Sequence, residues 1–128
     1  MDENLNELVD FLQGLLVGIN WNEAILNIEI QPGMLGLNGW AMLDEHKESL
    51  RTKPNENIKT AIRKLHSMTS TNESNKWNRF KLILKKNSEF VTEYIWDHDW
   101  QEKIEEENKR IKKLKPDYKV PKWNWELE

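Results

Sequence analysis

The sequence predicts a single α+β domain with the element order α-β-β-α-β-β-α, in which an antiparallel sheet of about four strands carries helices on one face. Three observations lead to this prediction. Some segments repeat apolar residues at intervals of three and four, as amphipathic helices do, whereas others alternate apolar and polar residues, as strands do. Turn residues separate the alternating segments. At 128 residues the chain suits one hydrophobic core, so we expect one domain over residues 1–128.

The first half of the chain predicts a helix followed by a hairpin. Residues 5–19 have the apolar stripe of a helix, and residues 24–30 alternate as a half-buried strand does. Pro32-Gly33 is a turn, and residues 34–43 form a second apolar segment that we expect to pair antiparallel with the first. Residues 44–56 are polar and predict a connection without regular structure.

The second half predicts a helix over residues 56–68, a surface loop over 67–76 and a second hairpin. A three-residue loop, Asn87-Ser88-Glu89, buries the apolar face of both strands of this hairpin, whereas a two-residue loop would bury an acid. The predicted pairs across this hairpin are Leu84 with Thr92, Leu82 with Tyr94, Phe80 with Trp96 and, on the other face, Arg79 with Asp97.

A third helix is predicted from Trp100 to Lys115, with Asp99 as its N-cap. Its acidic residues come early and its basic residues late, which complements the helix dipole. Pro116 ends it, and residues 116–128 form a tail that contains Trp123 and Trp125. We expect these tryptophans either to clamp the tail onto the sheet as a final edge strand or to contact a partner.

The charge of the chain is strongly asymmetric, although the net charge is only -3. Residues 1–50 contain nine acids and one base, whereas the remainder contains 18 bases and 13 acids. If the fold keeps the acids together, that side would repel nucleic acid and attract a basic partner; otherwise these acids only solvate the surface. The absence of cysteine, of a basic leader and of a long apolar run predicts a cytoplasmic protein that does not enter a membrane.

The most suggestive cluster for chemistry is Asp97-His98-Asp99. It offers three possible metal ligands, but adjacent residues seldom converge on one ion, and His46 and His66 have no ligand-spaced partner. The sequence also lacks a phosphate-binding glycine motif and a serine nucleophile elbow. We therefore expect no enzyme and no cofactor; a small metal-dependent enzyme that uses this cluster is the alternative.

The segment from Trp77 to Asp97 resembles the YezG-like family of small bacterial immunity proteins, with Trp77, Phe90, Tyr94 and Asp97 at the matching positions. This resemblance implies an immunity protein of a contact-dependent growth inhibition or polymorphic-toxin system. Such a protein binds a cognate toxin domain, commonly a nuclease, and blocks it. A generic protein-interaction domain is a further alternative.

A nuclease offers a basic cleft that an acidic surface can occupy, so we expect acids of this chain to face the toxin. The candidate toxin-binding residues are Glu23, Glu29, Asp44, Glu45 and Glu48, followed by Asp97 and Asp99, which also have structural uses.

Overall fold

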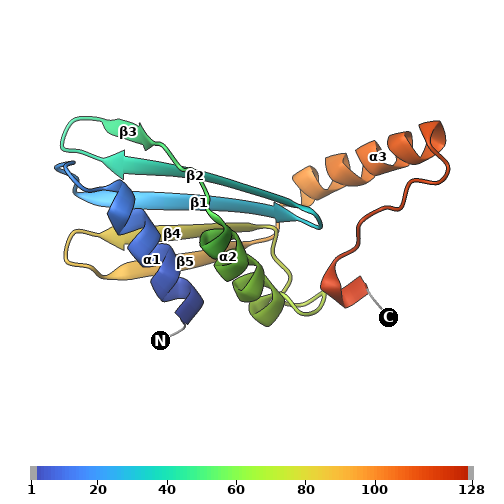
Figure 1. Cartoon of the computed structure of the whole chain (residues 1–128), viewed down its shortest axis with the longest axis horizontal. Coiled ribbons are helices and arrows are strands. Elements are labelled where there is room, and N and C mark those ends of the chain that lie inside the picture. The colour runs from blue at the N-terminus through green and yellow to red at the C-terminus, as the bar shows by residue number, and fades with distance from the viewer. Residues whose placement is uncertain (1–2, 127–128) are drawn as a thin grey trace.

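The structure of this chain is a computed structural model that describes residues 3–126. It is an α+β fold with one antiparallel sheet (Figure 1). Its elements, in chain order, are α1 (Glu3–Leu15), β1 (Glu23–Gln31), β2 (Met34–Met42), β3 (Lys47–Leu50), α2 (Glu56–Thr69), β4 (Arg79–Lys85), β5 (Phe90–Ile95), α3 (His98–Leu114) and the short 3-10 helix η1 (Asn124–Glu126).

The sheet has five strands in the order β3-β2-β1-β4-β5, one more than the sequence predicted. The additional strand, β3, lies within the segment that was expected to be an irregular connection. It has four residues, of which only Leu50 is buried, and it pairs with β2 alone. Such a short, polar edge strand lacks the apolar alternation that identifies a strand in a sequence, because its pairing depends on the edge that β2 presents.

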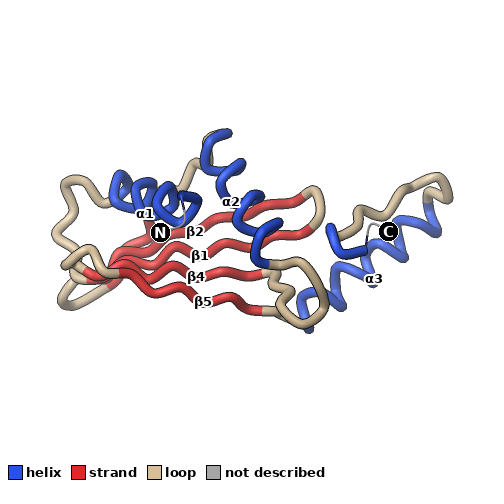
Figure 2. The backbone as a smooth tube through the Cα atoms, turned by 90° about the horizontal axis from the view of Figure 1, so that it is seen from below, coloured by secondary structure: helices blue, strands red, loops and turns tan. Residues whose placement is uncertain are grey.

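The core lies between one face of the sheet and two helices. α1 buries Leu8 and Leu12, and α2 buries Ile62 and Leu65, against this face. Figure 2 shows both helices on the same side of the strands. The strand residues that complete the core alternate along β1 and β4, as expected for half-buried strands: Ala24, Leu26, Ile28, Ile30, Phe80, Leu82 and Leu84.

The third helix does not cover the sheet, contrary to the prediction that the helices lie on one face. It extends beyond the end of the strands, and the chain after it turns back toward them (Figures 1 and 2). Only Gln101 is buried within α3. Its few apolar residues, such as Ile104 and Ile111, form a stripe too narrow to cover a sheet.

The β4–β5 hairpin has the predicted loop length and faces but a different register. The loop is Lys86-Asn87-Ser88, so Leu84 pairs with Phe90 and not with Thr92. Ser88 adopts the left-handed conformation, with a φ of 71°, which a three-residue hairpin loop requires. The shift is two residues, so the side chains stay on their predicted faces.

The tail does clamp onto the domain, but it does not add an edge strand as one prediction held. Trp123, directly before η1, is buried and stacks on Trp125 within η1, with ring centroids 5.0 Å apart. Trp123 also stacks on His66 of α2 at 5.3 Å and contacts Trp96 at 5.8 Å. Ring packing, with no strand pairing, thus holds the end of the chain. Among residues 3–126 no helix is both long and apolar enough to cross a membrane.

Candidate functional site

The face of the sheet opposite α1 and α2 is left uncovered by these helices (Figure 2). Side chains alternate along each strand, so the residues between the core positions point to this side. We call this surface the open face. Its residues are Lys47 and Ser49 of β3; Met34, Gly36, Asn38, Trp40 and Met42 of β2; Glu23, Ile25, Asn27 and Glu29 of β1; Arg79, Lys81, Ile83 and Lys85 of β4; and Val91, Glu93 and Ile95 of β5.

An apolar row crosses the open face at right angles to the strands. Trp40 pairs with Ile25, Ile25 with Ile83, and Ile83 with Val91, so four neighbouring strands each contribute one member. The ammonium nitrogen of Lys47 lies 4.6 Å from the centre of the Trp40 ring, which is a cation–π contact. Val91, at the β5 edge, is 51 % exposed. We call these four residues the apolar row.

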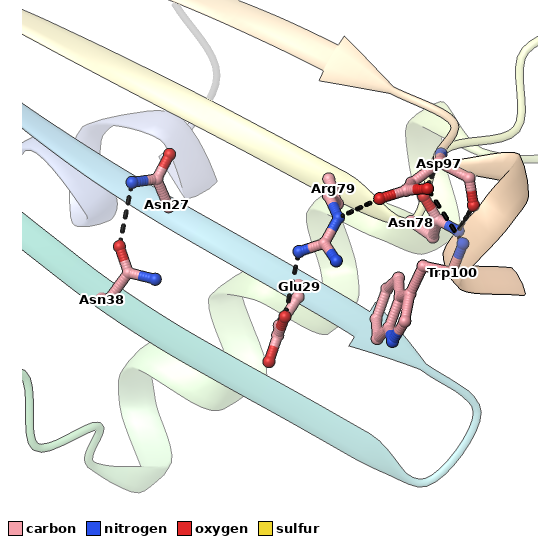
Figure 3. A network of polar contacts seen from close by, with 7 residues as sticks. All are labelled: Asn27, Glu29, Asn38, Asn78, Arg79, Asp97 and Trp100. Atoms are coloured by element: carbon pink, nitrogen blue, oxygen red, sulfur yellow. Dashed lines mark hydrogen bonds and ion pairs between the residues drawn. The ribbon is translucent and has the colours of Figure 1, made fainter. Parts of the chain in front are cut away.

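At the other end of the open face, Arg79 joins three elements (Figure 3). Its Nη1 donates to Glu29 at 3.0 Å and its Nε to Asp97 at 2.8 Å, while its guanidinium lies 4.4 Å from the centre of the Trp100 ring. A Cβ atom on Gly36 would lie 2.7 Å from a carboxylate oxygen of Glu29. A glycine at this position therefore gives the Glu29 side chain the space it occupies over β2.

Asp97, and not Asp99 as predicted, is the N-cap of α3. Its carboxylate accepts a hydrogen bond from the backbone N–H of Trp100 at 3.0 Å. This hydrogen bond, followed by the one from Arg79, holds the pKa of Asp97 below its ordinary value. Buried Asn78 fixes the cap, since its side chain accepts from the Asp97 N–H at 2.7 Å and donates to the Asp97 carbonyl at 3.1 Å.

A shallow groove of about 280 Å³ lies between these two regions of the open face. Asn27 donates to Asn38 across β1 and β2 at 2.9 Å on one side of the groove, and Arg79, Lys81 and Ile95 line the other side (Figure 3 shows Asn27, Asn38 and Arg79). The groove therefore offers amide and cationic groups beside an apolar side chain.

The open face is not acidic. It has four bases and three acids, and Glu23 is paired with Lys85 at 2.7 Å, as Glu29 is with Arg79. Two predicted toxin-binding acids on this face thus have basic neighbours.

Four of the predicted acids lie around one corner of the sheet, where β2 ends and β3 begins: Glu23, Asp44, Glu45 and Glu48. We call this group the acidic corner. Asp44 accepts a hydrogen bond from the side chain of Asn22, and Glu48 lies 3.3 Å from His46. Neither Asp44 nor Glu45 forms an ion pair with another described residue, and both are exposed.

The remaining predicted acids lie at the opposite end. Glu29 is six residues along β1 from Glu23, or about 20 Å at the rise of a strand, and it shares Arg79 with Asp97. Asp99 is exposed in the first turn of α3. The seven predicted residues therefore do not form one continuous acidic surface.

The side chains of Asp97-His98-Asp99 do not converge. Asp97 faces Arg79 and the Trp100 N–H, whereas the Nε2 of His98 lies 2.9 Å from a carboxylate oxygen of Glu102 on the exposed side of α3. Within residues 3–126 no group of three or more histidine, aspartate and glutamate side chains is arranged to hold a metal ion.

Comparison with known proteins gives no relative from which to transfer a function. No protein-family model matches the chain, and no curated protein matches it.

The sequence reasoning missed the apolar row. Its signal was present, since Ile25 and Ile83 occupy the strand positions that alternate with the core residues, and Trp40 lies one residue from buried Ala41. Apolar residues on both faces of a strand indicate either burial on both sides or a binding surface.

Proposed function

We propose that the protein is an immunity protein that binds a cognate toxin domain, a nuclease, and neutralises it by stoichiometric occlusion without turnover. The observation that carries this proposal is the open face, whose apolar row lies one row of side chains from Glu23 at the acidic corner. The resemblance of the Trp77–Asp97 segment to YezG-like immunity proteins gives the class of partner.

The apolar row supplies the aromatic and apolar side chains that the centre of a protein interface needs. Interfaces concentrate their binding energy in a few aromatic and apolar anchors, which charged and polar residues surround and shield from water. Trp40 is only partly buried, and Lys47 and Glu23 lie in the rows beside it. Trp40 is therefore the anchor of the proposed interface.

The acidic corner supplies the negative charge that a basic nuclease cleft would bind. A nuclease must hold phosphate groups, so its active-site cleft is basic, and carboxylates can take the place of the phosphates. Asp44 and Glu45 are exposed in the turn after β2, beyond Met42, and form no ion pair with a basic residue among residues 3–126. Charges at the margin of an interface mainly accelerate association, and salt weakens this effect.

The proposal is tested with the toxin domain encoded beside the gene of this chain. The two proteins should form a 1:1 complex, and co-expression should abolish toxicity. Reversing three charges, with Asp44→Lys, Glu45→Lys and Glu48→Lys together, should slow association at least about 10-fold at low salt. The salt dependence of the association rate should become weaker in this variant.

The matched control reverses three exposed acids outside the acidic corner, with Asp10→Lys, Glu106→Lys and Asp117→Lys. The same change in net charge should slow association much less, because it does not adjoin the interface. Equal effects of the two triple variants would contradict a local role of the acidic corner. Absence of any complex with the toxin domain would contradict the proposed function, while a stable complex with a non-toxic partner would indicate a general interaction domain.

A further inference from the structure

We propose that the cleft between α3 and the returning tail binds a guanidinium group. Beyond the end of the sheet α3 leads away, and the chain after it comes back toward the strands (Figure 1). A cavity of about 300 Å³ lies between them. Gln31 at the end of β1, Gln101 and Glu105 of α3, and Trp123 and Glu126 of the tail line it.

Gln31 borders this cleft, and its buried side chain contains an unused hydrogen-bond acceptor. Its side chain is 3 % exposed, and its Oε1 has no hydrogen-bond partner in the part of the chain that the structure describes. A buried acceptor without a donor is rare in folded proteins, because it has lost its hydrogen bonds to water. A ligand that carries N–H groups would satisfy it.

The orientation of the Gln31 amide follows from its neighbours. A carboxylate can only accept, so Gln101 turns its Nε2 toward Glu105, 3.4 Å away. This orientation points the Gln101 Oε1 toward Gln31, which must then donate through Nε2, at 2.8 Å. The Oε1 of Gln31 is therefore left without a donor at the end of this row of hydrogen bonds. Exchanging the O and N atoms of the Gln31 amide would break its hydrogen bond to Gln101.

The charges and the aromatic wall of the cleft favour a planar cation. Glu105 and Glu126 border it, against one base, Lys122. One carboxylate oxygen of Glu126 accepts from the backbone N–H of Trp123 at 3.0 Å, which leaves its second oxygen for a ligand. A guanidinium has five donors in one plane, pairs with carboxylates and stacks on aromatic rings, whereas an ammonium is more strongly hydrated and has no flat surface.

The cleft is distinct from the proposed toxin-binding corner. It lies where β1 ends, at Gln31, whereas the acidic corner lies where β1 begins, at Glu23. The guanidinium can belong to free arginine or to an arginine side chain of a polypeptide, and the two sources are separated by the choice of probe.

The test follows the side-chain amide resonance of Gln31 and the indole N–H resonance of Trp123 by NMR during titration. The probes are L-arginine, N-acetyl-arginine methylamide and the neutral analogue N-acetyl-citrulline methylamide. Saturable shifts with the arginine probes, and binding of the citrulline analogue at least about 10-fold weaker, are expected, since a charge-assisted pair is lost. Tighter binding of L-arginine than of the capped probe indicates a site for the free amino acid; binding of the capped probe that is as tight or tighter indicates a polypeptide side chain.

Unmoved resonances with both arginine probes would overturn the proposal, because Gln31 would then be satisfied by water alone. Equal binding of the citrulline analogue would overturn the requirement for a cation.

Two matched variants locate the site. Glu126→Gln keeps an acceptor for the Trp123 N–H but removes the charge, and it should weaken binding about 10-fold. Glu106→Gln removes the same charge from α3 outside the cleft and should leave the affinity unchanged. An equal loss of affinity in both variants would show that only the net charge matters, and it would contradict a specific binding site in the cleft. Gln31→Met removes the acceptor itself; binding that persists in the folded variant would contradict the role of Gln31.

Discussion

Asp97 combines the start of α3 with the ionic contacts at one end of the open face. Because hydrogen bonds from Trp100 and Arg79 lower the pKa of Asp97 in the folded state, its carboxylate stabilises the fold above its ordinary pKa, and this contribution is lost as the pH falls through the lower folded value. We expect Asp97→Ala to reduce the urea midpoint at pH 7 more than Asp97→Asn, because the amide retains the capping acceptor.

At acidic pH the stability of Asp97→Asn should depend on pH differently from that of the wild type. Stability measured from pH 6 down to pH 2 should fall less steeply in Asp97→Asn than in the wild type, since the variant has no carboxylate to protonate there. Identical pH profiles of the two proteins would contradict the assigned role of Asp97.

The sequence predicted Asp99 as the N-cap of α3, whereas the N-cap is Asp97, two positions earlier. The difference has a physical reason. Asp97 and Asp99 both precede the helical periodicity, so the local sequence offers two caps. The choice is made by Asn78, which holds the backbone of Asp97 through two hydrogen bonds from 19 residues away. The predicted strand pairing of Arg79 with Asp97 was wrong, since Arg79 pairs with Ile95. The two side chains still form an ion pair, because a shift of two residues keeps them on the same face.

At the scale of elements, aromatic side chains pack the tail against the domain. One of them, His66, should make this packing depend on pH. Burial lowers the pKa of His66, and the nearby charge of Arg63 lowers it further. The neutral ring therefore belongs to the folded state, so stability is present above the ordinary pKa of histidine and is lost as the pH falls. We expect the tail to loosen between pH 7 and pH 5, detected as faster amide exchange in residues 116–126.

The matched variant His66→Phe keeps an aromatic ring beside Trp123 but cannot bind a proton. Its tail should show a smaller change in exchange over the same pH range. A change as large as that of the wild type would assign the effect to other groups.

The two tryptophans of the tail should differ in their contribution. Trp123 is 6 % exposed, whereas Trp125 is only partly buried. Trp123→Ala should remove up to about 3 kcal/mol of tail stability, as loss of a buried large aromatic residue does, and Trp125→Ala less. Limited proteolysis should therefore cut residues 116–126 fastest in Trp123→Ala. Equal cleavage in the two variants and the wild type would contradict the clamp.

The elements that the sequence predicted well are those whose apolar pattern also forms the core. α1, α2, β1, β2 and the second hairpin all fall near their predicted positions. β3 was missed because its only buried residue is Leu50, and the hairpin register was shifted because Ser88 adopts a conformation more typical of glycine. Neither feature has a signal in the local pattern.

At the scale of the whole molecule, the sequence could not say where the third helix goes. Its amphipathic spacing predicted a place on the sheet, but the only buried residue of the helix is the polar Gln101, and the helix leaves the sheet at Asp97. The apolar row lies on the face opposite α1 and α2, and α3 leaves that face uncovered as well (Figure 2). The candidate acids were found from charge alone, and the fold then divided them between two ends of β1, with Glu23 at one and Glu29 at the other.

The packing of Glu29 over Gly36 on the open face can be tested by substitution. Gly36→Ala places a methyl group where the Glu29 carboxylate lies, so Glu29 must move away from its position beside Arg79. The flexible end of a side chain can give way at low cost, so the melting temperature should change by only a few degrees. NMR should show a shift of the Arg79 guanidinium resonances, because Nη1 donates to Glu29; unchanged Arg79 signals would contradict the packing of Glu29 over β2.

The central claim is that the open face, and not the helical face, binds the partner. The most direct measurement compares the affinity of Trp40→Ala with that of Met68→Ala, which removes an exposed apolar side chain from α2, for the toxin domain encoded beside this gene. The account predicts a loss of about 30-fold or more for Trp40→Ala, as expected for an interface anchor, and unchanged affinity for Met68→Ala. Wild-type affinity of a folded Trp40→Ala variant, or a loss confined to Met68→Ala, would contradict it.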